Sequence, residues 1–246
     1  MNPRNTARIV GLLFIIGTIA GVSSFVGAPT MDDPDYLVNI AANGNLTIRA
    51  SLFVLIMGIA LAPVPALLFP ILKKVDESFA LGYVVFRVLE AVTYIISIIS
   101  WLSLLTLSRE YVLAGAPSAS HYQTLGSILL SVGTWVDPIL VIIFSISALI
   151  LNYLLYKSIL VPRWLSGWGF FGGLLHLVEG LLNMFGMLSG MPIAALFFVP
   201  IALQEMVYAV WLIAKGFNVE VVWISEDKIT YAIGGEQVST EEYTEG

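Results

Sequence analysis

Six long apolar stretches constrain this chain more than any other feature of its sequence. Crossing a bilayer as an α-helix takes roughly 20 mostly apolar residues, and a backbone in lipid must satisfy its own hydrogen bonds. The stretches are residues 9–27, 50–72, 79–107, a fourth that starts between 125 and 137 and ends near 156, 165–188, and 192–214. They predict an all-α fold, a polytopic membrane bundle with six transmembrane helices and a lipid bilayer around it.

The composition supports a membrane protein and excludes several function classes. Hydrophobic residues make up 58% of the 246 residues and charged residues 11%, whereas soluble domains have about 45–50% and about 25%. The chain has no cysteine, which excludes disulfides, thiolate nucleophiles and cysteine-ligated metals. It also lacks the basic patch that a nucleic-acid partner would need.

The chain divides into a transmembrane domain, residues 1–218, and an acidic tail, residues 219–246. In the tail, "VEVVWISEDKITYAI" alternates β-branched with polar residues around a turn and predicts a small β-hairpin. The tail contains one base, Lys228, and seven acids: Glu220, Glu226, Asp227, Glu236, Glu241, Glu242 and Glu245. We expect a solubilising role for it, with binding of a cytoplasmic partner as the alternative.

The lysines and arginines predict the orientation, because short cytoplasmic loops collect them. With a cytoplasmic N-terminus, only Arg49 and Arg109 fall on the outer side, and Arg87 lies within a span. The inner segments hold Arg4, Arg8, Lys73, Lys74, Lys157, Arg163, Lys215 and Lys228. Six spans return the chain to its starting side, so we expect a multi-pass protein of the cell membrane with both termini cytoplasmic.

Local signals qualify three of these segments. The first apolar stretch resembles a secretory signal, but it is longer than the usual ~7–15 residue core, which favours an uncleaved anchor. The second contains Pro63, Pro65 and Pro70, which predict a kink or, as in transporters, a break that lines a site. "DDPD" before residue 36 is typical of a helix start and predicts a short helix in the outer loop.

Five ionisable side chains lie deep in the apolar stretches: Arg87, Glu90, His176, Glu179 and Glu205. A charge in the bilayer centre costs roughly 2.5–3.5 kcal/mol on insertion scales, so such groups face the bundle interior and pair. From the predicted inner ends they are roughly 12–21 Å deep at a rise of 1.5 Å per residue. We therefore expect them to form one layer near the middle of the membrane.

Helical periodicity places each of these groups on a polar stripe. Asp137 of the fourth span lies nearer the outer surface than the five deep groups, so we expect water to reach it. The stripes are Tyr83, Arg87, Glu90, Tyr94 and Ser97; Thr134, Asp137, Ser145, Ala148 and Asn152; Gly169, Gly172, His176, Glu179 and Asn183; and Glu205, Tyr208, Leu212 and Lys215, with Gln204 beside the last. The candidate ligand-binding residues are Arg87, Glu90, Tyr94, Asp137, His176, Glu179 and Glu205.

The deep layer is not electrically balanced. With three ionised glutamates, one arginine and a neutral histidine its charge is −2. One glutamate pairs with Arg87, and the other two need protons, a cation, water or a protonated His176. Either a proton, cation or small ligand binds there, or the groups form a structural network that fixes the order of the helices.

A metal centre is a weaker interpretation. His176 and Glu179 stand three residues apart on one helical face, as ligands do in di-metal carboxylate bundles. Glu90 and Glu205 would complete only a one-histidine set, whereas catalytic zinc prefers more nitrogen or sulfur ligands. No nucleotide, hydrolase or metalloprotease motif is present, so the sequence indicates no metal or cofactor and does not favour an enzyme.

The order of the segments resembles an uncharacterised prokaryotic multi-spanning membrane family, a domain of unknown function (DUF4386-like). The resemblance rests on "ARIVGLLFIIGTIAGV", "FRVLEAVTY", "LNYLLYKSILVPRWLSGWG" and "PIALQEMVYAVWLIAKGFN", which lie between Ala7 and Asn218. It implies a compact helical membrane bundle and no particular activity. It also implies that the position of Glu90 often holds an uncharged amide, so a carboxylate there is not obligatory.

Three functions fit these observations. The first is a small carrier or an ion-, proton- or ligand-binding bundle, with Glu179 and Glu205 as exchangeable carboxylates and Arg87 as their counter-charge. The second is an intramembrane enzyme acting on lipid, with His176 as a base or metal ligand. The third is a non-catalytic accessory protein that acts through the tail.

Overall fold

The computed structural model describes residues 2–29, 34–117, 121–188 and 194–218. The tail from residue 219 onward, including the predicted β-hairpin, lies outside the described residues, as do Asp32 and Asp33. Within them the chain is all-α, and its helices are α1 (Pro3–Ser24), α2 (Tyr36–Ala42), α3 (Gly44–Leu61), α4 (Pro63–Leu72), α5 (Glu77–Leu113), α6 (His121–Ser158), α7 (Arg163–Met184) and α8 (Ala194–Ala214).

Six helical segments in the described residues are long and apolar enough to cross a membrane. They are α1, the α3–α4 pair, and each of α5 to α8, which confirms the predicted polytopic bundle. The second segment breaks at Ala62, the residue before Pro63, because proline has no amide hydrogen to donate there. The predicted short helix in the first loop is α2.

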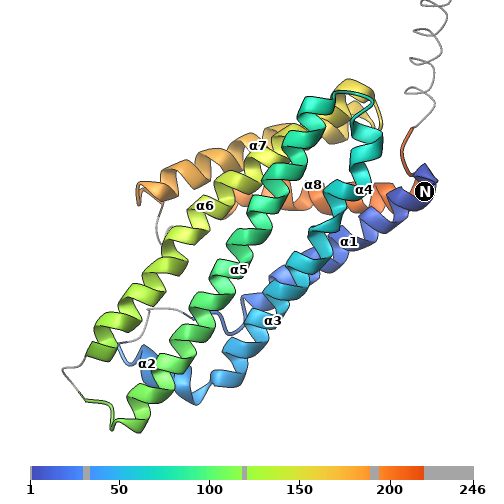
Figure 1. Ribbon diagram of the computed structural model, residues 1–246. Coiled ribbons are helices and arrows are strands. Elements are labelled where there is room, and N and C mark those ends of the chain that lie inside the picture. The colour runs from blue at the N-terminus through green and yellow to red at the C-terminus, as the bar shows by residue number, and fades with distance from the viewer. Residues whose placement is uncertain (1, 30–33, 118–120, 189–193, 219–246) are drawn as a thin grey trace, which may run out of the picture.

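The six membrane segments form a closed ring. Around the ring the order of neighbours is α1, α3, α5, α6, α7 and α8, and α8 packs back against α1. Figure 1 shows α5 and α6 side by side along the length of the molecule, with α7 and α8 beside only one half of them. A side chain that points inward from any one segment can therefore meet side chains from several others.

The outer face of the ring is apolar, as a surface against lipid should be. On α5 the side chains turned away from the bundle are Val85, Val88, Leu89, Val92, Ile95, Ile96 and Ile99, all exposed on the protein surface. Of the polar stripe predicted for the same helix, Tyr83, Arg87, Glu90 and Tyr94 are buried and Ser97 is half-buried. Periodicity thus indicated the inward face of α5 correctly.

Both ends of the membrane domain lie at the same end of the bundle. The guanidinium of Arg4 donates to the carbonyl of Ala214 at 2.7 Å, which joins the start of α1 to the end of α8. At this end Asp76 caps α5, and Lys157 of α6 lies 3.4 Å from its carboxylate. The hydrogen bond from the Phe79 amide, followed by Lys157, lowers the pKa of Asp76. We refer to this end as the terminal end.

α5 and α6 are longer than hydropathy alone predicts. They contain 37 and 38 residues, roughly 55 Å at 1.5 Å per residue, against a hydrocarbon core of about 30 Å. α5 therefore extends beyond the expected end at residue 107, and α6 begins before the expected start between residues 125 and 137. Beyond the lipid the helices continue because they bury a second cluster against α2: Leu37, Ile40, Leu104, Leu105, Tyr111 and Leu130.

Candidate functional site

The centre of the ring contains an arginine–glutamate pair from α5. Nη1 of Arg87 donates to both carboxylate oxygens of Glu90, each at 3.1 Å, and the hydroxyl of Tyr94 donates to Glu90 at 2.6 Å. Steps of three and four residues put these groups on one helical face. The side chains of Arg87 and Glu90 are 2% and 1% exposed, so this is a desolvated ion pair with a third hydrogen bond.

A second carboxylate approaches the same guanidinium from α8. Oε1 of Glu205 lies 3.5 Å from Nη2 of Arg87, and the Glu205 side chain is 20% exposed. This distance is too long for a good hydrogen bond. Of the two carboxylates around Arg87, Glu90 is thus firmly held and Glu205 is held weakly.

Three aromatic rings surround Arg87. The guanidinium carbon lies 5.7 Å from the ring centre of Phe14, 5.6 Å from that of Tyr83 and 5.3 Å from that of Phe144. These rings come from α1, α5 and α6, and each lies within cation–π range. They keep bulk water away from Arg87, which strengthens its attraction to both carboxylates.

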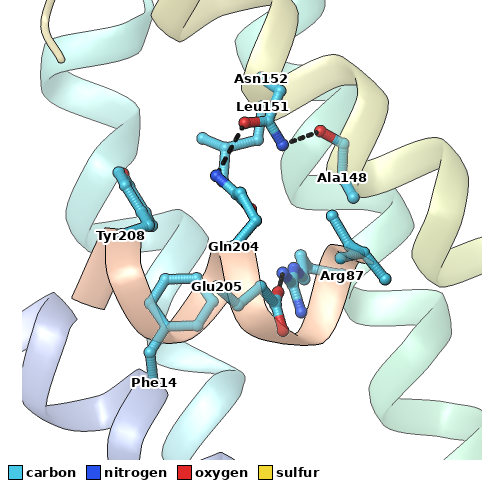
Figure 2. A pocket seen from close by; sticks show the side chains of 9 residues that line it. Phe14, Arg87, Ala148, Leu151, Asn152, Gln204, Glu205 and Tyr208 are labelled. Atoms are coloured by element: carbon cyan, nitrogen blue, oxygen red, sulfur yellow. Dashed lines mark hydrogen bonds and ion pairs between the residues drawn. The ribbon is translucent and has the colours of Figure 1, made fainter. Parts of the chain in front are cut away.

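A small cavity adjoins Arg87 and Glu205 (Figure 2). Its volume of about 10 Å³ is close to the room that one water molecule needs. Nε and Nη2 of Arg87 have no hydrogen-bond partner among the described residues. The lining residues are Phe14, Arg87, Ala148, Leu151, Asn152, Ile201, Gln204, Glu205 and Tyr208. The cavity therefore combines polar donors and acceptors at single-water size.

An amide junction closes one side of the cavity. The amide nitrogen of Gln204 donates to the side-chain oxygen of Asn152 at 3.3 Å (Figure 2). It also donates to the carbonyl of Leu165 at 3.3 Å. Asn152 in turn donates to the carbonyl of Ala148 at 2.9 Å. The junction ties α6, α7 and α8 together directly beside Glu205 and so positions that carboxylate.

His176 and Glu179 of α7 form a separate pair. Nδ1 of His176 lies 2.7 Å from Oε2 of Glu179, and both residues are buried. The imidazole lies 5.5 Å from the ring centre of Phe144, edge to face, and 5.4 Å from that of Phe198 on α8. Because Phe144 also packs on Arg87, a single aromatic ring separates the two charged pairs.

Asp137 lies at the edge of this arrangement. Its side chain is exposed, as expected for its place near the surface. It interacts electrostatically with Glu179 and His176, and Glu205 does so with His176. The expected single layer is therefore two linked groups, one around Arg87 and one around His176. No set of three His, Asp or Glu side chains suited to a metal occurs within the described residues.

Comparison with known proteins assigns the chain to a family. The profile of a family described as "Domain of unknown function (DUF4386)" matches residues 9–216, more than four-fifths of the chain. This chain belongs to that family. No curated protein and no solved structure matches it. The description assigns no activity to the family, so the site itself must carry a functional proposal.

In this DUF4386 protein, sequence reasoning found the charged groups and missed the rings between them. Phe14, Phe144 and Phe198 are ordinary apolar residues of membrane helices, and nothing in their local sequence distinguishes them from lipid-facing phenylalanines. A faint signal existed for Phe144, which stands seven residues after Asp137 and so shares its helical face. The Asn152–Gln204 contact joins positions 52 residues apart and required the fold.

Proposed function

We propose that this membrane protein is a small proton-binding protein of the carrier type, in which Glu205 exchanges a proton against the fixed charge of Arg87. The observation that supports it is one guanidinium shared by two carboxylates, Glu90 at 3.1 Å and Glu205 at 3.5 Å. One positive charge neutralises one carboxylate, and a second ionised carboxylate in the membrane interior is costly. Binding of a proton to one of the two carboxylates removes the excess negative charge.

The proton belongs on Glu205 rather than Glu90. Glu90 accepts two hydrogen bonds from Arg87 and one from Tyr94, and hydrogen bonds to the ionised form favour it. Within the described residues, Glu205 accepts no short hydrogen bond of this kind. Its carboxylate lies 3.5 Å from the guanidinium, farther than that of Glu90, and its side chain is 20% exposed. Glu90 and Arg87 therefore act as a fixed pair, while Glu205 gains and loses the proton.

The cavity beside Glu205 supports exchange rather than permanent protonation. It offers room for about one water molecule, and it touches Arg87, Glu205 and the Asn152–Gln204 junction. Water in this position would accept a hydrogen bond from Arg87 and donate one to Glu205. A carboxylate that meets water can exchange its proton far faster than one sealed in hydrocarbon.

The orientation that suits this function places the terminal end in the cytoplasm of the cell. Arg4, Lys73, Lys157, Arg163 and Lys215 lie at or next to the helix ends of that side. The far end has Arg49 and Arg109. The retention of basic residues on the cytoplasmic side supports this assignment.

Infrared spectroscopy of the protein reconstituted in lipid tests the proposal. At neutral pH we expect a carboxylic-acid C=O stretch from protonated Glu205, and we expect Glu205→Gln to remove it. The exposed carboxylate of Glu110 on α5 provides the matched control, and Glu110→Gln should leave the band unchanged. In proteoliposomes, Glu205→Gln should also abolish proton uptake driven by an imposed pH gradient.

Two results would overturn the proposal. The first is a wild-type spectrum without a protonated-carboxyl band at neutral pH, which would favour a bound cation as the neutralising partner of Glu205. The second is a band that survives Glu205→Gln, together with lost folding stability in that variant. That outcome would favour a purely structural network.

A further inference from the structure

We propose that the proton reaches Glu205 from the end opposite the termini, by a route from Asp137 through the Glu179–His176 pair. This inference rests on the proposed function of Glu205 and adds the path and the side from which the site is reached. It assigns a role to three titratable residues that the Arg87 group does not use.

The first argument is depth. Measured along each helix from the terminal end at 1.5 Å per residue, Glu205 is roughly 14 Å deep and His176 roughly 20 Å. On the same scale Glu179 is roughly 24 Å and Asp137 roughly 32 Å deep. Asp137 thus lies near the far boundary of a ~30 Å hydrocarbon core, and the other groups descend from it in steps of 4 to 8 Å, roughly.

The second argument is that consecutive groups interact. Asp137 interacts electrostatically with Glu179 and His176, and His176 with Glu205. Glu179 and His176 are hydrogen-bonded at 2.7 Å. The Glu179–His176 hydrogen bond is thus the direct link of the route. The steps from Asp137 to this pair and from His176 to Glu205 need water molecules or side-chain rotations to carry the proton.

The exposure of the side chains decreases from Asp137 to the Glu179–His176 pair, as a path for protons from water into the interior requires. Asp137 is exposed on the surface of α6, whereas His176 and Glu179 are buried at 6% and 8%. Phe144 of α6 and Phe198 of α8 both pack on the imidazole. Phe144 also packs on Arg87, so its ring closes the direct way from His176 to Arg87.

The neighbouring helices place further charged and titratable groups near the route, and none of them replaces a member of it. α5 contributes Arg87, Glu90 and Tyr94, which form the fixed group on the far side of Phe144. α1 contributes the ring of Phe14, which has no ionisable group and cannot transfer a proton. Among the described residues, the carboxylate that faces His176 from α8 is Glu205. The pair on α7 is thus the intermediate between an exposed acid and the exchangeable one.

Each transfer moves one proton and conserves charge. The O–H bond of protonated Asp137 breaks, and the proton binds the Glu179–His176 pair, which becomes a carboxylate with an imidazolium. Asp137 is left as a carboxylate and takes up the next proton from water. The imidazolium N–H bond then breaks, an O–H bond forms on Glu205, and His176 returns to its neutral form.

Hydrogen–deuterium exchange of the Glu205 C=O band tests the route. The full-length protein in lipid is moved from H₂O to D₂O, and the band shifts as the carboxylic proton is replaced. We expect Asp137→Asn and His176→Gln to slow this shift about tenfold or more, as loss of a positioned acid–base group does. Glu110→Gln, which removes an exposed carboxylate away from the route, should leave the rate unchanged.

Asp137→Asn is the deciding variant, because Asp137 is exposed on α6 and asparagine has nearly the same size as aspartate. The amplitude of the Glu205 band reports whether the site is intact. A slower shift with full amplitude in Asp137→Asn supports the route. Wild-type rates in both variants overturn the route and leave Glu205 as the proton site. A band that is missing from the wild type overturns the proposed function and the route together.

Discussion

At the scale of single residues, Arg87 is the group on which the interior depends. Its guanidinium faces two carboxylates and three aromatic rings, and its side chain is 2% exposed. A buried ion pair contributes little against a well-packed apolar substitute, but removing one partner leaves an uncompensated charge. The two partners of this group should therefore respond very differently to substitution.

Substitution of Arg87 should be far more damaging than substitution of Glu90. Arg87→Met leaves the buried Glu90 carboxylate without its cation and should lower the free energy of unfolding by about 3–5 kcal/mol. Glu90→Gln keeps an acceptor for Tyr94 and leaves Glu205 opposite Arg87, so its effect should be clearly smaller. Denaturant titration in mixed micelles measures both, with exposed Arg109→Met as a control within about 0.5 kcal/mol of wild type. Equal losses in the Arg87 and Glu90 variants would refute the central role of the guanidinium.

At the scale of the helices, the site depends on how closely α6, α7 and α8 approach one another. A Cβ atom on Gly169 would fall directly on the side-chain amide of Asn152, and one on Gly172 would lie 3.0 Å from the backbone nitrogen of Ile201. Close backbone approach through small residues is how membrane helices pack without a hydrophobic driving force. The Asn152–Gln204 bond, and with it the placement of Glu205, follows from this approach.

Two glycines of α7 give a matched test of that dependence. Gly169→Ala should displace Asn152 and reduce the stability by about 1–3 kcal/mol, as overpacking does. Gly167 has open space where its Cβ would lie, so Gly167→Ala should be neutral or stabilising by up to about 1 kcal/mol. Thermal unfolding of the two variants measures the difference. A loss of the same size at both positions would show that the helical glycines matter for another reason than this contact.

At the scale of the whole molecule, the ring has two unlike ends. The terminal end gathers the basic residues, and the far end extends beyond the lipid as the paired ends of α5 and α6 with α2 packed on them (Figure 1). This asymmetry agrees with the proposed orientation. Asp137, which is exposed on α6, lies in the half of that helix toward the protruding end, as the proposed proton route requires.

Labelling of introduced cysteines tests the orientation cleanly, because the chain has none of its own. In intact cells, a maleimide that cannot cross the membrane should react with Glu110→Cys and should react with Lys215→Cys only after permeabilisation. Ile95→Cys, on the lipid-facing side of α5, should remain unreactive in both conditions. The opposite order of labelling would invert the proposed topology and would direct the proton route to the cytoplasm.

Local patterns in the sequence were enough to predict the membrane segments and the inward faces of their helices. Hydropathy over about 20 residues and the 3.6-residue period depend only on near neighbours in the chain. That is why Arg87, Glu90 and Tyr94 could be placed on one buried stripe of α5 without a structure. The far ends of α5 and α6 lie beyond the limits that hydropathy predicts, because a helix can continue outside the lipid where it packs on other parts of the protein.

The number of spans, the family, and an interior with more acids than bases all follow from the order of residues along the chain. How those charges divide into groups depends on the three-dimensional packing of the helices. Arg87 meets Glu205 because the ring brings α8 close enough for the Glu205 carboxylate to lie 3.5 Å from the guanidinium. Phe144 separates Arg87 from His176 for the same reason. Such partners are far apart along the chain, and their meeting depends on the closure of the ring, which no local pattern encodes.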